Sequence, residues 1–274
     1  MTSISLPSGS TIPQLGFGTY RTRDTAAAVT EALRAGYRHV DTAQMYANEA
    51  GVGAGLRASG LPREEVFVTT KLRNDRHRPE DVRPSLEGSL QELGLEQVDL
   101  FLIHWPLPTL YGGDFVSTWE ALIELAEAGL TREIGVSNFQ PHHLDRLVEA
   151  TGVVPAVNQI EIHPYFTNDA VRARCAELGT AVQAWSPLGR GDEFADPVIA
   201  DVAAAHGVSP ARAILRWHVQ RGDVVIPKTD SPERMRDNAD LFGFALSEQE
   251  MAAITGLDKG ESGRRGGHPD SFEG

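Results

Sequence analysis

Residues 38–46 read RHVDTAQMY, a strand-like run that leads into Asp41 and is followed by Tyr46. In an open doubly wound sheet, the first strand would normally lead into a glycine-rich phosphate turn, and DTAQMY is no such turn. GFGTYR, at residues 16–21, precedes any strand–helix unit. The stretch therefore favours a closed parallel barrel over an open doubly wound sheet.

Strand-like runs and helix signals alternate along the rest of the chain. Short apolar or β-branched runs occur at 37–40, 66–70, 98–103, 132–136, 156–160, 181–185 and 224–226, with a weaker run at 241–244. N-caps, terminal glycines and a capping box mark helices within 24–36, 79–94, 209–222 and 247–255. Eight strands that alternate with helices and are buried on both faces predict a (β/α)8 TIM barrel.

The whole chain is expected to form this one barrel. Its 274 residues are 41% hydrophobic, and no Pro/Gly/Ser-rich linker divides them, so we predict a single domain over 1–274. ISLPSGSTIPQLGFG, at residues 4–18, is too turn-rich to be the first barrel strand. We expect it to form a short β-hairpin that covers the bottom of the barrel.

Composition limits the partners of this chain. A formal charge of −13 opposes general nucleic-acid binding, because a phosphate backbone would be repelled. No signal peptide and no run of ~18 apolar residues is found, so we expect a cytoplasmic protein with no membrane partner. We also expect a monomer. The single Cys175 lies in an amphipathic helical pattern and is expected to be a buried structural residue.

Ionisable residues follow three of the strand-like runs. Asp41, Lys71 and His104 occupy these positions, and parallel strands bring their carboxyl ends to one face. Asp41 is the natural partner of Lys71. A charged Lys71 would stabilise a phenolate and lower the pKa of Tyr46 from about 10, which would make Tyr46 a proton donor near neutral pH. His104 would hydrogen-bond a carbonyl oxygen.

Other site chemistries have weaker support. His163, His206 and His218 lack metal-ligand spacing, and His142 and His143 begin a helix, where adjacent side chains are expected to point apart. We therefore expect no metal. A serine hydrolase is unsupported because the chain has no G-x-S-x-G elbow. Tyr46 and the three ionisable residues around it include no hydride source, so a reduction would need a cofactor.

The ordered motifs resemble those of the aldo-keto reductase family, whose members are NAD(P)H-dependent carbonyl reductases on a (β/α)8 barrel. The resemblance covers nearly the whole chain, through GFGTYR, DTAQMY, TTK, IHWP, GVSNF, NQIE, WSPLG and IPKT. Within the family the chain looks most like the bacterial 2,5-diketo-D-gluconate reductase type, partly through GRRGGHPDSF at 263–272. That glycine-rich segment would be flexible on composition alone.

The resemblance implies a role for each of the four residues and for a cofactor site. Tyr46 would be the general acid/base, Lys71 would tune its pKa, Asp41 would hold Lys71, and His104 would orient the substrate. Trp185 would stack on the nicotinamide ring, a position at which many members have tyrosine. Ser137, Asn138 and Gln159 would bind its carboxamide, and the other implied contacts are Gly18, Thr19, Ser186, Leu188, Gly189, Lys228, Thr229, Arg234 and Asn238.

The segment IPKTDSPERMRDN, at 226–238, indicates which cofactor is bound. Lys228, Thr229 and Arg234 would converge on a phosphate at a helix start, in a pattern that resembles the site for the 2′-phosphate of NADPH. The substrate pocket would be walled by Tyr20, Trp105 and Phe115.

The sequence thus predicts an NADPH-dependent oxidoreductase that reduces a small aldehyde or ketone to an alcohol. Two alternatives stay open at this stage. One is a regulatory or sensor barrel that binds NADPH with little turnover. The other is an aldolase that forms a Schiff base at Lys71.

Overall fold

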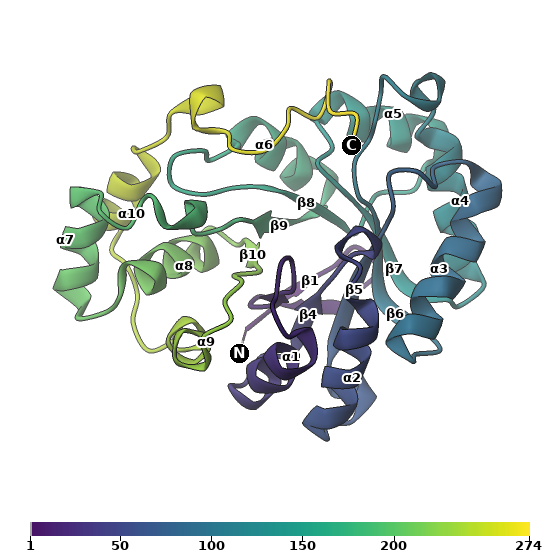
Figure 1. Ribbon diagram of the computed structural model, residues 1–274. Coiled ribbons are helices and arrows are strands. Elements are labelled where there is room, and N and C mark those ends of the chain that lie inside the picture. The colour runs from purple at the N-terminus through teal and green to yellow at the C-terminus, as the bar shows by residue number, and fades with distance from the viewer. Residues whose placement is uncertain (1) are drawn as a thin grey trace.

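The computed structural model describes residues 2–274. Within this range, eight parallel strands follow one another around a barrel (Figure 1). They are β3 (Phe17–Gly18), β4 (His39–Asp41), β5 (Phe67–Leu72), β6 (Val98–Ile103), β7 (Thr131–Ser137), β8 (Val157–Glu161), β9 (Ala181–Trp185) and β10 (Val224–Val225). The ring closes where the Gly16 N–H donates to the Val225 carbonyl and the Val225 N–H donates to Gln14, both at 2.8 Å. The predicted (β/α)8 barrel is confirmed.

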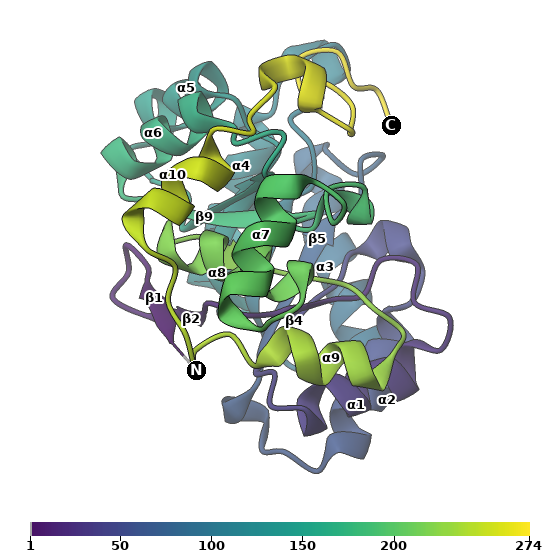
Figure 2. The ribbon, with the colours of Figure 1, turned by 90° about the vertical axis from the view of Figure 1, so that its left-hand side faces the viewer.

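Helices surround the barrel on its outside (Figures 1 and 2). They are α1 (Thr25–Arg34), α2 (Glu49–Ser59), α3 (Pro79–Leu93), α4 (Val116–Glu127), α5 (Pro141–Thr151), α6 (Asp169–Leu178), α7 (Pro197–His206), α8 (Pro210–Gln220), α9 (Pro232–Ala239) and α10 (Glu248–Thr255). Their ends follow the predicted caps: Asp24 accepts from the Ala27 N–H, and Ser247 and Glu250 form a capping box. Within residues 2–274, no single helix is long and apolar enough to cross a bilayer. In this range only α7 and α8 taken together reach that length and apolar composition, and a bend of 90° separates them.

A hairpin precedes the barrel, as predicted. Strands β1 (Ser3–Ser5) and β2 (Thr11–Pro13) pair antiparallel. Leu6 and Ile12 from the hairpin join an apolar cluster with Val157 and Val224, which lie at the amino ends of β8 and β10. The hairpin therefore covers the end of the barrel from which the strands start.

The start and the end of the predicted strand series need correction. The barrel strand β3 lies inside the segment predicted to form only a hairpin, whereas 241–244 is not a strand. Strand β3 was missed because its two residues are flanked by turns, and its pairing comes from distant partners. At the other end, arginine side chains rather than a neighbouring strand satisfy the backbone: Arg212 donates to the Asp240 carbonyl at 2.6 Å and Arg216 to that of Leu241 at 3.2 Å.

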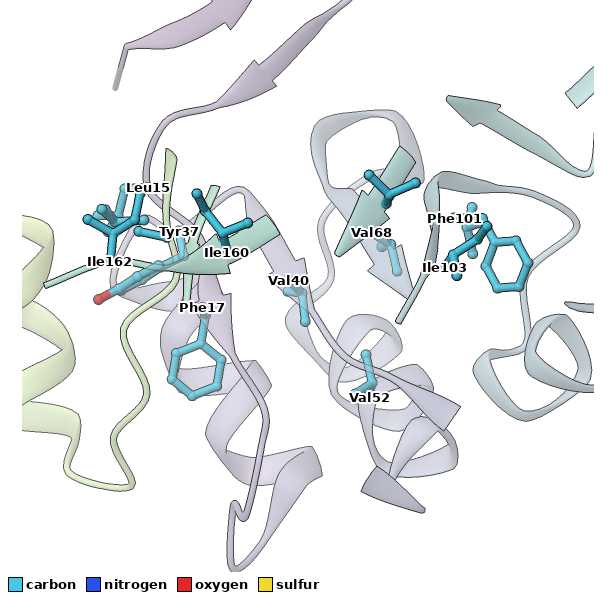
Figure 3. Packing of buried hydrophobic residues seen from close by; sticks show 14 of the residues in the cluster. Leu15, Phe17, Tyr37, Val40, Val52, Val68, Phe101, Ile103, Ile160 and Ile162 are labelled. Carbon is cyan, nitrogen blue, oxygen red and sulfur yellow. The ribbon is translucent and has the colours of Figure 1, made fainter. Parts of the chain in front are cut away.

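Side chains alternate between the two faces of the barrel sheet because successive strand residues point to opposite sides. Val40, Val68, Phe101, Ile103 and Ile160 belong to the main apolar core between strands and helices (Figure 3). Their chain neighbours on the same strands, including Asp41, point into the barrel instead. Apolar residues therefore seal the outside of the sheet while polar residues collect inside it near the carboxyl ends of the strands.

The single cysteine is buried in α6, as expected. Cys175 accepts a hydrogen bond at its Sγ from the Asn158 side-chain amide at 3.6 Å. Burial raises the pKa of its thiol to about 11. Because thiolate is the reactive form, these features indicate a structural residue.

Candidate active site

A cavity of about 640 Å³ opens at the carboxyl ends of the barrel strands. Most of the residues predicted for the site line it, and they come from segments widely separated in the sequence. The predicted residues that line the cavity are Gly18, Thr19, Tyr20, Asp41, Tyr46, His104, Trp105, Ser137, Asn138, Gln159, Trp185, Ser186, Leu188 and Lys228. The predicted residues outside this lining are Lys71, Phe115, Gly189, Thr229, Arg234 and Asn238.

Lys71 and Asp41 form a buried ion pair beneath the cavity. The Lys71 Nζ lies 2.6 Å from Asp41 Oδ1 and 2.8 Å from the Thr42 carbonyl oxygen. Burial acts to lower the pKa of Lys71, but the Asp41 charge and hydrogen bonds outweigh it and leave that pKa raised. Lys71 is therefore a protonated ammonium, and the two residues pair as predicted from their strand positions.

Two glutamine side chains hold the second oxygen of Asp41. Gln159 donates to Asp41 Oδ2 at 2.7 Å, and Gln183 donates to it at 3.2 Å. Gln183 faces Gln159 in the register of β8 and β9 and is buried. The sequence reasoning missed Gln183, although its inward position on β9, two residues before Trp185, could have revealed it.

Tyr46 reaches the cavity from a short 3-10 turn, Gln44–Tyr46, that follows β4. Gln44 fixes this turn: its amide donates to the Ser85 carbonyl and its oxygen accepts from the Arg73 N–H. Burial raises the pKa of the Tyr46 hydroxyl above its usual value of 10.0, while the nearby charge of Lys71 acts to lower it. The expected net decrease in this pKa is wrong, because desolvation outweighs the ammonium.

His104 follows β6 on the far side of Tyr46. The two rings meet edge to face, with 5.9 Å between their centroids. Burial, together with the charge of Lys71, lowers the pKa of His104 well below 6.5, so the imidazole is neutral near pH 7. A neutral imidazole carries one N–H donor, and Nδ1 has no hydrogen-bond partner within residues 2–274. The ring lines the cavity between Tyr46 and Trp105.

Asn138 organises the end of β7. It has a left-handed backbone, with φ of 65°, which asparagine tolerates better than most residues. Its amide nitrogen donates to the His104 carbonyl at 2.9 Å, and its oxygen accepts from the Trp185 indole N–H at 2.8 Å. One side chain therefore links the imidazole-bearing segment to the indole on β9. The neighbouring Ser137 hydroxyl donates to the Gln159 carbonyl at 2.8 Å.

The segment after β9 forms one wall of the cavity. Ser186 and Leu188 line it, and Ser186 has a φ of 48°. Gly189 lies behind the wall rather than in it, against the buried carboxylate of Glu193. A Cβ at Gly189 would lie 2.3 Å from Glu193 Oε1, so only glycine fits there.

The residues predicted to clamp a phosphate lie before and within α9. Lys228 lines the cavity and lies 2.6 Å from Asp230, whose carboxylate it contacts. Thr229 accepts from the Ser231 N–H at 3.1 Å and thus helps to start α9. Arg234 is exposed in the first turn of that helix, and Asn238 is buried near its end. The convergence of Lys228, Thr229 and Arg234 on a phosphate stays a prediction.

Aromatic residues form the mouth of the cavity. The rings of Tyr20 and Tyr46 have centroids 4.9 Å apart, and Trp105 stacks on Phe272 at 3.9 Å. Phe115 departs from its predicted place in the pocket wall. It directly precedes α4 and lies in the core, with its ring packed edge to face against Phe139. Its apolar side chain is buried by helix packing rather than by the pocket.

Several cavity residues escaped the sequence reasoning. Met45 precedes Tyr46 directly, and its position could have suggested it. Phe272 had no local signal because it lies in a glycine-rich terminal segment whose path depends on distant contacts. The lining residues that were missed are Arg21, Met45, Pro187, Arg190, Ile226, Pro227 and Phe272.

His142 and His143 do not point apart as expected. Their rings lie 4.1 Å apart, and both Nε2 atoms approach Asp270 Oδ1, at 3.3 and 3.4 Å. The three side chains have the spacing of metal ligands. However, His143 Nδ1 accepts from the Gln140 N–H at 3.1 Å, so in neutral imidazole the proton sits on Nε2. That proton suits a hydrogen bond to Asp270 and opposes metal binding at the same atom.

Comparison with known proteins places the chain in a family. The model of the aldo/keto reductase family matches residues 12–192 and 193–259. An aldo-keto reductase of Mycolicibacterium smegmatis is 47% identical, with 98% of this chain and 97% of the relative covered. The 2,5-diketo-D-gluconic acid reductase B of a Corynebacterium species is 44% identical, with 99% and 98% covered.

A solved structure agrees with these sequence matches. The crystal structure of a Bombyx mori aldo-keto reductase in complex with NADP has a TM-score of 0.90 and 39% identity, and the match covers 96% of this chain and 94% of that one. With the family model spanning most of the sequence and relatives matching end to end, this chain belongs to the aldo/keto reductase family.

Proposed function

We propose that this protein is an NADPH-dependent reductase that converts an aldehyde or ketone to an alcohol, with Tyr46 as the proton donor. The observation that carries the proposal is the set of Tyr46, Lys71, Asp41 and His104 around one cavity whose wall includes the flat Trp185 indole. Membership of the family and its NADP-bound relative support the cofactor.

The lining of the cavity suits a dinucleotide chemically. It includes the aromatic side chains of Tyr46 and Trp185, the segment with Ser186 and Leu188, and the cationic side chain of Lys228. Gly18 lets β3 pack closely against the segment after β10, since a Cβ there would lie 2.9 Å from the Ile226 carbonyl oxygen. When bound, NADPH supplies the hydride that no side chain of the site provides.

Specific residues would hold the two ends of the cofactor. Trp185 would stack on the nicotinamide ring, and Ser137, Asn138 and Gln159 would bind its carboxamide. Gly18, Thr19, Ser186 and Leu188 would border the dinucleotide, and Gly189 would support this wall from behind. Lys228, Thr229, Arg234 and Asn238 would bind the adenosine end, where Arg234 is exposed and available for a 2′-phosphate.

The proton chemistry depends on Tyr46 and the ammonium below it. Because the pKa of Tyr46 is raised, its hydroxyl is protonated at neutral pH and has a proton to give. Once the proton leaves, the phenolate is stabilised by Lys71, whose Nζ lies 5.1 Å from the centre of the tyrosine ring. Asp41 keeps Lys71 charged, and neutral His104 would donate a hydrogen bond to the carbonyl oxygen.

The contacts of Lys71 oppose the aldolase alternative. A Schiff-base lysine attacks as a neutral amine, whereas Lys71 is held as an ammonium by Asp41 and the Thr42 carbonyl. The sensor alternative differs from the reductase in turnover alone, so an assay decides between them. Steady-state NADPH oxidation with a reactive aldehyde should be readily measurable.

The proton donor is tested by Tyr46→Phe. We expect reduction to fall by roughly two to four orders of magnitude, the usual scale of acid–base catalysis, with NADPH affinity nearly intact. NADPH titration followed by tryptophan fluorescence checks binding. Unchanged turnover would refute the assignment of Tyr46.

The choice of NADPH is tested by Arg234→Ala, with Arg236→Ala as the matched control on the same helix. We expect the first substitution to weaken NADPH much more than NADH and the second to affect both little. Equal losses for the two cofactors in Arg234→Ala would remove the case for recognition of the 2′-phosphate.

For the substrate, we infer a small carbonyl compound. The cavity mouth is aromatic, and one relative acts on a sugar-derived diketone according to its name. A screen of NADPH oxidation over simple aldehydes, keto acids and sugar-derived diketones would rank these classes. A monomeric state and a cytoplasmic location stay predictions from the sequence.

A further inference from the structure

Glu161 occupies a position next to the proposed cofactor wall, and none of the functions above uses it. It ends β8 and faces Trp185, the last residue of β9, in the register of the two strands. Its side chain is buried, with 1% of the residue exposed. A buried carboxylate needs hydrogen-bond donors, so its partners show what it holds in place.

Those partners are two successive N–H groups of the C-terminal segment. The Arg265 N–H donates to Glu161 Oε1 at 2.8 Å, and the Gly266 N–H donates to Oε2 at 2.9 Å. His163 Nε2 lies 3.2 Å from Oε1. Burial acts to raise the pKa of the Glu161 carboxyl, but hydrogen bonds from His163 and the two N–H groups keep it below its usual value.

The segment held in this way lies directly against the Trp185 indole. A Cβ on Gly266 would lie 2.5 Å from Cη2 of Trp185, which is too close for any side chain. At its other end, the indole donates its N–H to Asn138 at 2.8 Å. The ring is therefore held on one side by a hydrogen bond and on the other by the backbone of Gly266.

A second buried carboxylate supports the arrangement from behind. His163 Nδ1 lies 2.6 Å from Glu193 Oε1, and the Arg265 guanidinium lies 3.6 Å from the same oxygen. His163 thus sits between Glu161 and Glu193, and these two carboxylates raise its pKa against the effect of burial. Positive charge from His163 and Arg265 thus lies beside the two buried carboxylates.

Gly267 packs against the mouth of the cavity rather than against Trp185. A Cβ on Gly267 would lie 2.4 Å from Cδ2 of Phe272, and Phe272 stacks on Trp105 at the cavity mouth. The C-terminal segment, whose Asp270 lies 3.4 Å from His143 in α5, therefore touches both the indole wall and the mouth. The two adjacent glycines therefore have different neighbours: Gly266 packs against Trp185, and Gly267 packs against Phe272.

We propose that Glu161 is a positioning residue for the reductase: it holds the backbone of Arg265 and Gly266 against Trp185 and so fixes the plane on which the nicotinamide stacks. The proposal rests on the proposed function, in which Trp185 is the stacking residue. Hydride transfer requires close alignment of donor and acceptor carbons, so a small tilt of this plane has a large effect.

The central test is Glu161→Gln, with two ligands compared by calorimetry. Glutamine offers one carbonyl oxygen and cannot accept from both N–H groups, so the segment loses a charge-assisted contact. We expect NADPH to bind roughly tenfold more weakly, the change expected for the loss of one such hydrogen bond. Binding of 2′,5′-ADP, which lacks nicotinamide, should be unchanged. Equal weakening of both ligands would overturn the proposal.

Gly266→Ala and Gly267→Ala form a matched pair. Neither glycine has a positive φ, so each added methyl acts through contacts rather than backbone strain. We expect Gly266→Ala to reproduce the selective loss of NADPH affinity and Gly267→Ala instead to raise the KM for the carbonyl substrate. If Gly267→Ala impairs NADPH as strongly as Gly266→Ala does, the specific contact with Trp185 is not the cause and the proposal fails.

Trp185→Ala separates this proposal from the one on which it rests. If Trp185→Ala weakens NADPH selectively while Glu161→Gln and Gly266→Ala do not, the positioning role is wrong and the stacking role stands. If Trp185→Ala leaves the ratio of NADPH to 2′,5′-ADP affinity unchanged, the stacking role itself is wrong. Urea unfolding of each variant confirms that folded proteins are compared, and Gly266→Ala keeps the test valid if Glu161→Gln fails to fold.

Discussion

The ammonium of Lys71 lies 2.6 Å from the Asp41 carboxylate, and both side chains are almost completely buried from solvent. Each charge depends on the other because water does not replace the partner. Removing one member of a buried ion pair leaves an uncompensated charge, whereas replacing both with neutral groups avoids this penalty. The pair proposed to serve proton transfer is therefore also a determinant of stability.

Asp41→Asn should destabilise the protein by about 3–5 kcal/mol, because it leaves the Lys71 ammonium buried without its counter-charge. Urea unfolding at pH 7 measures this difference. The double variant Asp41→Asn/Lys71→Met should recover much of the stability and none of the activity. A single variant as stable as the parent would mean that the ion pair does not hold the two charges as described.

The pH profile of reduction should lack a step near pH 6.5. His104 stays neutral there because burial lowers its pKa well below that value, and Tyr46 stays protonated because burial raises its pKa. We expect kcat/KM for reduction to be flat from about pH 6 to 9 and to fall only as the tyrosine hydroxyl loses its proton at higher pH. An inflection near neutrality that His104→Gln abolishes would contradict the neutral imidazole.

Acid should destabilise the fold through buried histidines. Burial lowers the pKa values of His39 and His77 to about 4, against 6.5 for an ordinary histidine. As pH falls from 6.5 to 4, these histidines become protonated in the unfolded chain but stay neutral in the folded protein. Each histidine should therefore lower the free energy of unfolding by about 2 kcal/mol at pH 5. Urea unfolding at pH 7 and pH 5 tests this, and His77→Gln should make the loss smaller. Equal stability at both pH values would be the contrary result.

Two helix glycines should respond in opposite directions to alanine. A Cβ on Gly53 in α2 would lie 2.2 Å from the Leu93 carbonyl oxygen, whereas a Cβ on Gly88 in α3 would meet nothing within 4 Å. Gly53→Ala should destabilise the fold by about 1–3 kcal/mol through overpacking. Gly88→Ala should stabilise it by up to about 1 kcal/mol because alanine favours helix. Thermal unfolding of both variants compares them directly, and a neutral Gly53→Ala would show that α2 and α3 can separate without cost.

Local patterns predicted the barrel and the position of its chemical groups. Asp41 and Lys71 follow apolar runs, and the two-residue period of a strand places them inside the barrel, so their pairing could be inferred without coordinates. Helix caps such as Asp24 and Ser247 depend on residues three positions away, so they could also be predicted from the sequence. What depended on short-range geometry was therefore predictable.

Contacts between residues far apart in the sequence could not be predicted in this way. Strand β3 exists because Gly16 and Gly18 bond to the residues around Val225 and Pro227, some 200 positions away, which no local pattern encodes. Phe272 lines the cavity from a glycine-rich terminal segment whose backbone is hydrogen-bonded to Glu161, and no local pattern in that segment indicates this long-range contact. The pKa of Tyr46 was misjudged for a related reason: the sequence names the charged neighbour but not the extent of desolvation.

The closure between β3 and β10 has a dynamic consequence. These are the two shortest barrel strands, with two residues each, whereas β5 and β6, which carry Lys71 and lead to His104, have six. Fewer ladder bonds mean a lower free energy for local opening, so amide hydrogens at this seam should exchange with solvent before those of β5 and β6. Gly18, Ile226 and Lys228 border the cavity on the seam side. The barrel thus combines a compliant seam beside the cavity with a rigid side on which the ion pair and imidazole keep their alignment.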